Sequence, residues 1–367
     1  MSIPKEATQI FLRACPTGFI NPKFNEADST FEIKQVPIPP LKDGEVLVKT
    51  LYLSNDPTQR TWLKKAGDST PSYLPPVHEG TPMASFGIAE VVDSKSYKYV
   101  KGNVVLGRLY WADYAVLPDT VIFNKVDAKA WLPLEYYLSV LGMTTLTAYF
   151  GLTKVAELKN DDSGKGKIVL VSAAAGAVGS SVVQIAKHLL GASKVIGIAS
   201  SDEKCQWIES LGADLGVNYK TKDWQKQIDD YLAKDDEGVD VYFDCVGGEM
   251  LSYALTKMNK FGHIALCGCI AAYNDPSALV VTTLFYAITK RLTLKGFIVD
   301  DFVAEFGEVL PVLADAIKDG KLKAEGSYHV EELTGHSITQ RLEEIPAIWN
   351  LLFKGDKPKG KLLTKVA

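Results

Sequence analysis

Hydrophobic positions between residues 167 and 200 change their period twice, and this change predicts a βαβ unit. The run Ile168–Val171 is short, β-branched and free of polar positions, as expected of a strand buried on both faces of a parallel sheet. After a turn of small residues, apolar side chains recur at helical spacing up to Gly191, which stands where a C-cap is expected. Residues 195–198 form a second apolar run, which predicts the next strand.

The alternation of strand and helix continues downstream and predicts a doubly wound parallel sheet of the α/β class. Helical spacing covers residues 202–211 and 223–233, and strand-like runs cover residues 215–219, 239–243 and 264–267. Ligands of such sheets bind outside the carboxyl ends of the strands. We therefore expect the residues after these strands to face a cofactor, namely Tyr219, Cys245 and the loop of residues 267–274 with Cys267, Ile270 and Tyr273.

The first third of the chain has mostly period two, which predicts a largely antiparallel, barrel-like domain. Strand-like runs cover residues 45–53, 86–92 and 113–117, and Pro and Gly separate them. A helical pattern over residues 135–152 is expected to link this domain to the parallel sheet. The final stretch, with a helix near residues 340–353 and a strand near 360–364, is expected to return to the barrel.

Two apolar segments after the parallel strands allow more than one interpretation. The run over residues 279–285, continued over residues 292–299, predicts either an inner strand or an edge that pairs with a second subunit. Pro311 lies inside the apolar pattern of residues 302–317, where it either kinks a helix or starts its second half.

The turn between the first strand and its helix reads Ala174-x-Gly176-x-x-Gly179. The pyrophosphate of a dinucleotide needs backbone N–H groups and a helix N-terminus within contact distance, and a Cβ at the closest position would hold it away. Gly176 meets this need, with Ala177 and Val178 beside it. Gly179 lets the helix pack closely on the strand, and Ala174 takes the place of the usual first glycine. The turn therefore predicts a nucleotide site, against the alternative of a plain βαβ crossover.

The residues after the second strand bear on which nucleotide is bound. NAD sites place an acidic residue about 20 residues after the glycines, where it binds the ribose 2′-hydroxyl. Here that place holds Ser200 and Ser201. Ser201 can N-cap the next helix, with Asp202 and Glu203 suiting the helix dipole, and Lys204 follows in the first turn, where a cation is normally disfavoured. A 2′-phosphate would explain the lysine. The alternative is a solvated lysine beside two acidic residues, one of which is Asp202.

Composition narrows the class of protein. With 367 residues, 47% hydrophobic and 23% charged, the chain is long enough for about two globular domains. Its net charge of −4 argues against nucleic acid or an anionic membrane as the main partner. We expect a cytoplasmic protein, since no signal core or long apolar run is seen. The five cysteines are scattered without disulfide or zinc spacing and are expected to be reduced.

Six motifs in one order give the chain a family resemblance. They are residues 146–152 (LTAYFGL), the glycine turn 173–179 (AAAGAVG), Gly197 with 201–204 (SDEK), 218–220 (NYK), 243–248 (FDCVGG) and Tyr273-Asn274. The chain resembles the zinc-independent medium-chain dehydrogenases/reductases, in the branch of prostaglandin reductases and plant double-bond (2-alkenal) reductases. The resemblance spans residue 45 to the last residues of the chain.

The resemblance implies a fold, a reaction and a cofactor. The fold is a GroES-like β-barrel at residues 1–141, a Rossmann NADP-binding domain at 142–319, and a return to the barrel at 320–367. The reaction is reduction by NADPH of the C=C bond of α,β-unsaturated ketones or aldehydes, in an enzyme that is usually a homodimer. Reduction of quinones, or NADPH binding with little catalysis, are the alternatives.

Carried over to this sequence, the resemblance also implies roles for individual residues. Lys204 and Tyr219 would contact the 2′-phosphate, residues 176–178 the pyrophosphate, and Met143 with Phe297, Ile298 and Val299 the nicotinamide. The motifs depart from the family at Thr58, where relatives have a tyrosine that lines the substrate pocket. A further departure lies at residues 355–361, where an asparagine that often touches the cofactor is missing.

The chemistry of enone reduction indicates one catalytic candidate. Hydride addition at the β-carbon leaves negative charge on the carbonyl oxygen, so a hydrogen-bond donor is needed there more than a nucleophile. Tyr273 is that candidate, with the ribose 2′-hydroxyl and a water as rival donors and with simple packing on the cofactor as the alternative role. Zinc is not expected, because His78-Glu79 supplies only part of a ligand set. Cys267-x-Cys269 reads as small residues at a strand end, and no hydrolase motif is found.

Overall fold

The computed structural model describes residues 3–127, 132–159, 166–234, 238–355 and 357–367. These residues form two compact units. The first comprises residues 1–138, 329–358 and 362–367, and the second comprises residues 139–328 and 359–361. The chain therefore leaves the first unit near Leu138, returns to it after Tyr328, and contributes three late residues to the second unit.

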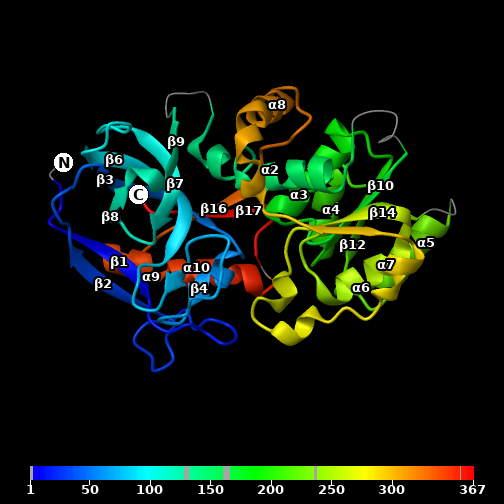
Figure 1. Ribbon diagram of the computed structural model, residues 1–367, viewed down its shortest axis with the longest axis horizontal. Coiled ribbons are helices and arrows are strands. Elements are labelled where there is room, and N and C mark those ends of the chain that lie inside the picture. Colours follow the sequence, from blue (N-terminus) through cyan, green and yellow to red (C-terminus); the bar gives the residue numbers. More distant parts are fainter. Residues whose placement is uncertain (1–2, 128–131, 160–165, 235–237, 356) are drawn as a thin grey trace. The chain divides into compact units, whose positions relative to one another are not determined.

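The first unit is built on a seven-stranded sheet with the order β16-β17-β3-β6-β7-β9, in which β8 also pairs with β3 (Figure 1). The pairings of β3 with β6, β8 and β17, and of β7 with β6 and β9, are antiparallel. The strands are β3 (Glu45–Asn55), β6 (Ala84–Ser94), β7 (Val104–Tyr110), β8 (Tyr114–Pro118), β9 (Ile122–Val126), β16 (Tyr328–Glu332) and β17 (Lys361–Lys365). The expected antiparallel barrel-like fold is confirmed, and its last strand, β17, pairs with β3.

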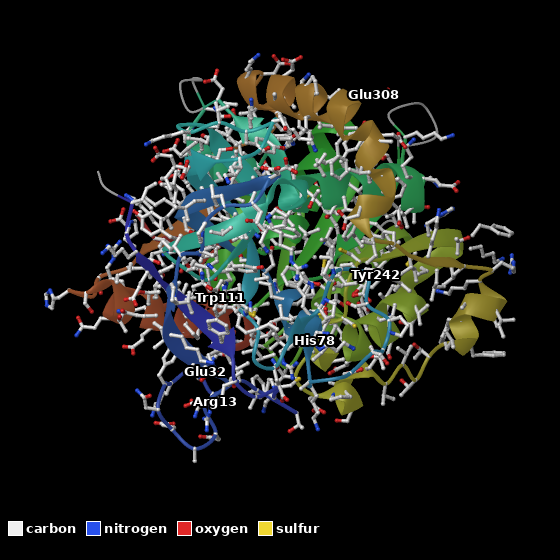
Figure 2. All side chains as sticks on the ribbon, turned by 60° about the vertical axis from the view of Figure 1, so that its left-hand side comes forward. Arg13, Glu32, His78, Trp111, Tyr242 and Glu308 are labelled. Carbon is white, nitrogen blue, oxygen red and sulfur yellow. The ribbon has the colours of Figure 1, made fainter. Side chains whose placement is uncertain are left out.

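Smaller elements complete the first unit. The strands β1 (Glu6–Leu12) and β2 (Phe31–Pro37) form an antiparallel pair, and β4 (Leu63–Lys64) and β5 (Val77–His78) form a short parallel one. The helices are α1 (Gln59–Trp62), α9 (Ile338–Glu343) and α10 (Ile345–Asn350). The core of the unit packs together the rings of Trp111, Trp349 and Phe31. Trp349 meets both other rings edge-on, with the centroids of Trp111 and Trp349 5.7 Å apart, and Phe31 is tilted against Trp111. Trp111 is labelled within this unit in Figure 2.

The second unit holds a six-stranded sheet with the order β12-β11-β10-β13-β14-β15, in which every neighbouring pair is parallel (Figure 1). Its strands are β10 (Ile168–Val171), β11 (Lys194–Ala199), β12 (Leu215–Asn218), β13 (Val239–Asp244), β14 (Met258–Leu266) and β15 (Thr293–Gly296). The order reverses at β10, which is the arrangement of a doubly wound Rossmann sheet. The predicted fold class is confirmed.

Helices cover both faces of this sheet because the buried strands are apolar on both sides. Val169 and Val171 face a core shared with α2 (Met143–Phe150), α3 (Ala177–Gln184), α4 (Asp202–Ser210) and α8 (Phe306–Lys318). Ile168 and Leu170 face a second core shared with α5 (Trp224–Ala233) and α6 (Gly248–Lys257). A short helix α7 (Phe285–Thr289) follows on the α6 side. Side chains that alternate along one strand therefore serve two separate cores.

Three expectations about single segments need correction. The pattern over residues 135–152 is not one helix, because Gly142 adopts an extended conformation and separates a 3-10 segment (Leu134–Leu138) from α2. Residues 279–285 are not a strand; Asp275 caps a 3-10 turn (Pro276–Leu279), and α7 begins at Phe285. The helix near residues 340–353 is divided into α9 and α10, with Pro346 in the first turn of α10.

The apolar run over residues 292–299, which continues the run over residues 279–285, contains an edge strand. β15 (Thr293–Gly296) pairs with β14 and ends the order of the sheet, so it is an edge strand and not an inner one. Its pairing with a second subunit stays a prediction. Pro311 lies within α8, on its exposed side, and the helix runs through it. Glu308 marks the first turn of the same helix in Figure 2.

Candidate cofactor and active site

The helix α3 begins directly at the glycine turn, without a side chain that caps it. Gly176 is the N-cap residue, in an extended conformation with φ −86° and ψ 177°. The first N–H groups of an α-helix have no partner inside the helix, so the amides of Ala177, Val178 and Gly179 lie at the start of α3 as donors. This arrangement suits an anion such as a pyrophosphate.

Close packing of α3 on the strand end explains the second glycine. A Cβ built on Gly179 would lie 2.4 Å from the backbone oxygen of Ala173 and 2.7 Å from Cα of Ala174. Neither backbone atom can move cheaply, so any side chain at this position would push the helix away. The turn is formed by Ala173, which takes a positive φ of 49°, and not by Ala174. The residue in the place of the usual first glycine therefore keeps ordinary backbone geometry.

The end of β11 leads into a lysine and a tyrosine on neighbouring elements. The N-cap of α4 is Ser201, whose hydroxyl accepts from the Lys204 amide at 3.3 Å, as the sequence indicated. The Lys204 ammonium donates to the hydroxyl of Ser200 at 3.0 Å. Tyr219 follows β12, is exposed, and donates its backbone amide to the oxygen of Ala199. Lys204 and Tyr219 therefore flank the same strand end.

The two acidic residues before Lys204, Asp202 and Glu203, each bind another side chain. Asp202 accepts from the side-chain amide of Asn218 at 2.8 Å, across from α4 to the end of β12. Glu203 is paired with Lys359 at 3.0 Å. The groups at this strand end therefore fit a ribose that bears a phosphate. They are the Ser200 hydroxyl, the Lys204 ammonium and the Tyr219 phenol, while the Asp202 carboxylate is already bound to the Asn218 amide.

A buried carboxylate organises the turn after β13. Four donors reach the same oxygen, Oδ1 of Asp244: the Ser172 hydroxyl at 3.1 Å, the Tyr242 hydroxyl at 2.9 Å, and the amides of Val246 and Gly247 at 3.0 Å each. Burial raises the pKa of Asp244 above its ordinary value, and these hydrogen bonds offset only part of that rise. Burial and the Asp244 charge raise the pKa of Tyr242, which keeps that phenol a donor. Figure 2 shows Tyr242 inside the second unit.

The turn at Asp244 in turn supports the loop that holds Tyr273. The Asp244 backbone oxygen accepts from the amides of Cys267 and Gly268, at 2.8 Å and 3.2 Å. The Cys245 oxygen accepts from Ile270 at 3.3 Å, and the Val246 oxygen accepts from Ala271 at 3.2 Å. Four main-chain bonds thus fix the loop after β14 onto the turn after β13.

Tyr273 closes this loop and folds back over its start. It follows a 3-10 turn (Ile270–Ala272), and its hydroxyl lies 3.1 Å from a Cβ built on Gly268. A larger residue than glycine at position 268 would therefore displace the phenol. Cys245, Cys267, Ile270 and Tyr273 are brought together here, all partly buried. Burial raises the pKa of the Cys269 thiol, which keeps the thiol protonated and unreactive.

The residues expected beside a nicotinamide share one apolar environment. Met143, Phe297 and Val299 are partly buried and pack against the same core, the one beneath α2 and α3. The ring of Phe297 meets that of Phe243 edge-on, with centroids 6.2 Å apart. A Cβ on Gly151 would lie 2.7 Å from Phe297, so this glycine makes room for the ring. Ile298 lies between Phe297 and Val299 and is also partly buried.

Thr58 belongs to the first unit, whereas all the residues expected to bind the cofactor belong to the second. It lies just before α1, and its hydroxyl is hydrogen-bonded to that of Tyr73. The Tyr73 hydroxyl also accepts from Nε1 of Trp62 at 3.2 Å. Sequence reasoning missed Tyr73, which lies among the prolines that separate two of the predicted strands. Its position beside Thr58 depends on contacts between segments 15 residues apart.

The alternative of a zinc site at His78-Glu79 finds no ligand cluster in the described part of the chain. No group of three or more His, Cys, Asp or Glu residues there could hold a metal ion. The Nδ1 atom of His78 lies 3.1 Å from the backbone oxygen of Lys65. Glu79 accepts from the amides of Cys15 and Ala66, and these hydrogen bonds lower its pKa. Both residues of the His78-Glu79 pair therefore take part in local loop structure.

Comparison with known proteins agrees with this architecture. Residues 8–124 match the domain family described as N-terminal domain of oxidoreductase, and residues 177–315 match the family described as zinc-binding dehydrogenase. Prostaglandin reductase 1 of Bos taurus is 40% identical over 92% of this chain and 94% of its own length. The NADP(+)-dependent 2-alkenal reductase of Nicotiana tabacum is 37% identical over 95% and 94%.

A solved structure has a similar fold and matches nearly the whole chain. The crystal structure of CurA from Vibrio vulnificus in complex with NADPH superimposes with a TM-score of 0.80, at 30% identity and 98% coverage of both chains. Fold and site thus define a two-domain oxidoreductase with a dinucleotide-binding Rossmann unit. The chain belongs to the medium-chain dehydrogenase/reductase family, in the branch of prostaglandin reductases and 2-alkenal reductases. The resemblance inferred from the motifs is confirmed.

Proposed function

We propose that this protein uses NADPH to reduce the C=C bond of α,β-unsaturated ketones or aldehydes. The observation that supports this most directly is the common edge of the parallel sheet. It presents the uncapped start of α3, the Lys204 ammonium and the Tyr273 loop at the carboxyl ends of β10, β11 and β14. Relatives with this architecture are named NADP-dependent 2-alkenal reductase and prostaglandin reductase.

Each group of residues has a distinct task in this proposal. The amides of Ala177 to Gly179 bind the pyrophosphate, and Ser200, Lys204 and Tyr219 bind the adenosine ribose with its 2′-phosphate. The apolar side chains of Met143, Phe297, Ile298 and Val299 orient the nicotinamide, and Cys245, Cys267 and Ile270 line the cofactor side of the strand ends. NADPH supplies the hydride when it is bound.

Tyr273 stabilises the negative charge that forms on the carbonyl oxygen of the substrate. The phenol donates a hydrogen bond to the carbonyl oxygen, stabilises the enolate that forms there, and helps to protonate it. The ribose 2′-hydroxyl and a water are rival proton donors. Thr58 is proposed as a substrate contact, together with the adjoining Tyr73 hydroxyl.

A panel of substrates tests the reaction class. NADPH oxidation is followed by absorbance with alkenals, alkenones, quinones and saturated aldehydes, and product analysis locates the reduced bond. We expect turnover with alkenals and alkenones and a saturated carbonyl product. Faster turnover of quinones would favour quinone reduction, and NADPH binding without turnover of any member would favour a binding protein.

Substitution of Lys204 tests the choice of cofactor. Lys204→Ala should raise the KM for NADPH about tenfold, while the KM for NADH changes less than about twofold, because a charge-assisted bond to a phosphate is lost. Steady-state kinetics with both coenzymes at a fixed alkenal concentration give the two values. Equal changes for the two coenzymes would reject the assignment of Lys204 to the 2′-phosphate.

We also propose a homodimer that forms through the edge of the parallel sheet. β15 ends the sheet, and the nearby helix α7 exposes apolar side chains, with Phe285 70% and Ile288 71% accessible. An exposed strand edge beside an apolar patch is typical of a subunit interface. Analytical ultracentrifugation should give twice the chain mass, and Ile288→Glu should shift it to the monomer; a wild-type monomer would contradict the proposal.

We further propose that the enzyme works without zinc, in the cytoplasm. All five cysteines are free thiols in the structure. No helix in the described ranges is both long and apolar enough to cross a membrane. Full activity of the protein after dialysis against a chelator, with no zinc found by elemental analysis, is the expected result.

A further inference from the structure

A late segment of the chain lies against the glycine turn of the Rossmann unit. The amide of Gly360 donates to the oxygen of Ala175 at 3.0 Å, and Gly360 forms a parallel β-bridge with Gly176. Gly360 is buried with a positive φ of 72°, and a Cβ there would lie 2.1 Å from the Ser327 oxygen. Only glycine fits this position. The backbone of residues 359–361 is therefore fixed beside the phosphate turn.

This anchoring places one cation next to the end of β11. The Lys359 ammonium is 3.0 Å from Oε1 of Glu203, in the first turn of α4. Glu203 is the residue directly before Lys204, whose own ammonium donates to Ser200. Two lysines, 155 positions apart in the chain, are thus bound to residues at the start of the same helix, Lys359 to Glu203 and Lys204 to Ser200.

We propose that Lys359 is a second cation for the 2′-phosphate of NADPH and a determinant of the preference for NADPH over NADH. This inference rests on the proposed function, since it concerns the coenzyme of the same site. The Lys359 and Glu203 side chains are 38% and 78% exposed, and surface pairs of this kind contribute little to stability. A phosphate offers more charge and three acceptor oxygens, so exchange of the carboxylate for the phosphate is favourable.

Glu203 has the opposite effect in the same proposal. Its carboxylate lies beside the phosphate position and repels a second anion, and it holds Lys359 while the coenzyme is absent. Removal of this charge should therefore strengthen the binding of a 2′-phosphorylated ligand and leave other ligands unaffected. A simpler alternative is that Lys359 only neutralises Glu203 and never meets the phosphate.

Binding measurements without substrate separate these two roles. The ligands are NADPH, NADH, 2′,5′-ADP and 5′-AMP, titrated calorimetrically into wild type, Lys359→Ala, Glu203→Gln and the double variant. We expect Lys359→Ala to weaken NADPH and 2′,5′-ADP about five- to tenfold and NADH less than about twofold. Glu203→Gln should tighten the two phosphorylated ligands about two- to threefold.

The double variant decides between direct contact and neutralisation. If Lys359 contacts the phosphate, Lys359→Ala still weakens NADPH at least about threefold when Glu203 is already glutamine. No effect of Lys359→Ala in that background, or an equal effect on NADH, would overturn the inference. Lys226→Ala is the matched control, because Lys226 pairs with Asp230 on the surface of α5.

A conservative variant and a folding control complete the experiment. Lys359→Arg should retain most of the NADPH preference, and thermal melting confirms that each variant is folded. If wild-type protein binds neither NADPH nor 2′,5′-ADP, the proposed function itself fails. If it binds both and Lys359→Ala changes neither affinity, only the role of Lys359 fails.

Discussion

Tyr273→Phe should lower the turnover of an alkenone at least about tenfold, while the affinity for NADPH changes less than about twofold. The phenol is fixed over Gly268 by a loop that four main-chain hydrogen bonds hold to the turn after β13. Phenylalanine keeps the ring and its packing but removes the only group of this side chain that can donate to a developing oxyanion. Steady-state kinetics with NADPH and coenzyme titration without substrate measure the two quantities.

The control for this substitution is Tyr97→Phe, because Tyr97 is a fully exposed tyrosine of the first unit. It should change neither quantity. If Tyr273→Phe also leaves turnover unchanged, Tyr273 has no part in the chemistry, and the ribose 2′-hydroxyl or a water becomes the proton donor. A loss of NADPH affinity with constant turnover would instead assign Tyr273 to coenzyme packing.

Asp244→Ala should lower the free energy of unfolding of the second unit by about 3 kcal/mol or more. The substitution leaves two hydroxyls and two amides without their acceptor, in a place where Asp244 is 1% exposed and Tyr242 and Ser172 are fully buried. A buried polar group without a hydrogen-bond partner has lost its hydration and has no protein contact that compensates, so the folded state is destabilised. Thermal and urea unfolding, followed by circular dichroism, measure the loss.

Asp244→Asn refines this prediction, because all four donors bind the same carboxylate oxygen. An amide oxygen can take that position, so we expect a smaller loss, about 1 to 2 kcal/mol, from the weaker uncharged acceptor. The surface variant Asp230→Ala should change stability by less than about 0.5 kcal/mol. A loss for Asp244→Ala no larger than that of Asp230→Ala would show that the network contributes nothing to the fold.

The sequence predicted best those elements whose residues agree with one period. The run Ile168–Val171 is apolar at every position, and β10 has these bounds, because a central parallel strand is buried on both faces. Ser201 was recognised as a helix cap from its place before Asp202 and Glu203, and the structure shows that cap. Both features depend on neighbours in the sequence.

Elements that depend on distant partners were missed or given wrong bounds. The helix α6 was missed. It begins at two glycines, both with positive φ, which the sequence showed only as the end of the motif at residues 243–248. β16 is short and partly exposed, and it pairs with a strand 33 residues later. The helical pattern at residues 135–152 concealed the break at Gly142, because the apolar spacing continues on both sides of it.

In the candidate site, too, features set by neighbours in the sequence were predicted, and features set by distant residues were missed. The glycine turn and Lys204 could be found because each motif lies within a few residues of one strand end. The Asp244 network joins Tyr242 and Asp244 of β13 to Ser172, which directly follows β10. Tyr73 lies in a Pro-rich loop and contacts Thr58 from there. Lys359 was recognised only as part of a departure from the family motif. Its ion pair with Glu203 exists because Gly360 is fixed beside Gly176.

The position of β17 in its sheet has a consequence for the order in which the protein can be completed during synthesis. β17 lies between β16 and β3, so the seven-stranded sheet needs residues 361–365 before its neighbours are joined. The six-stranded sheet needs nothing beyond residue 296 and can form while the ribosome is still translating. The sheet whose first strands are translated earlier is therefore the one that is completed later.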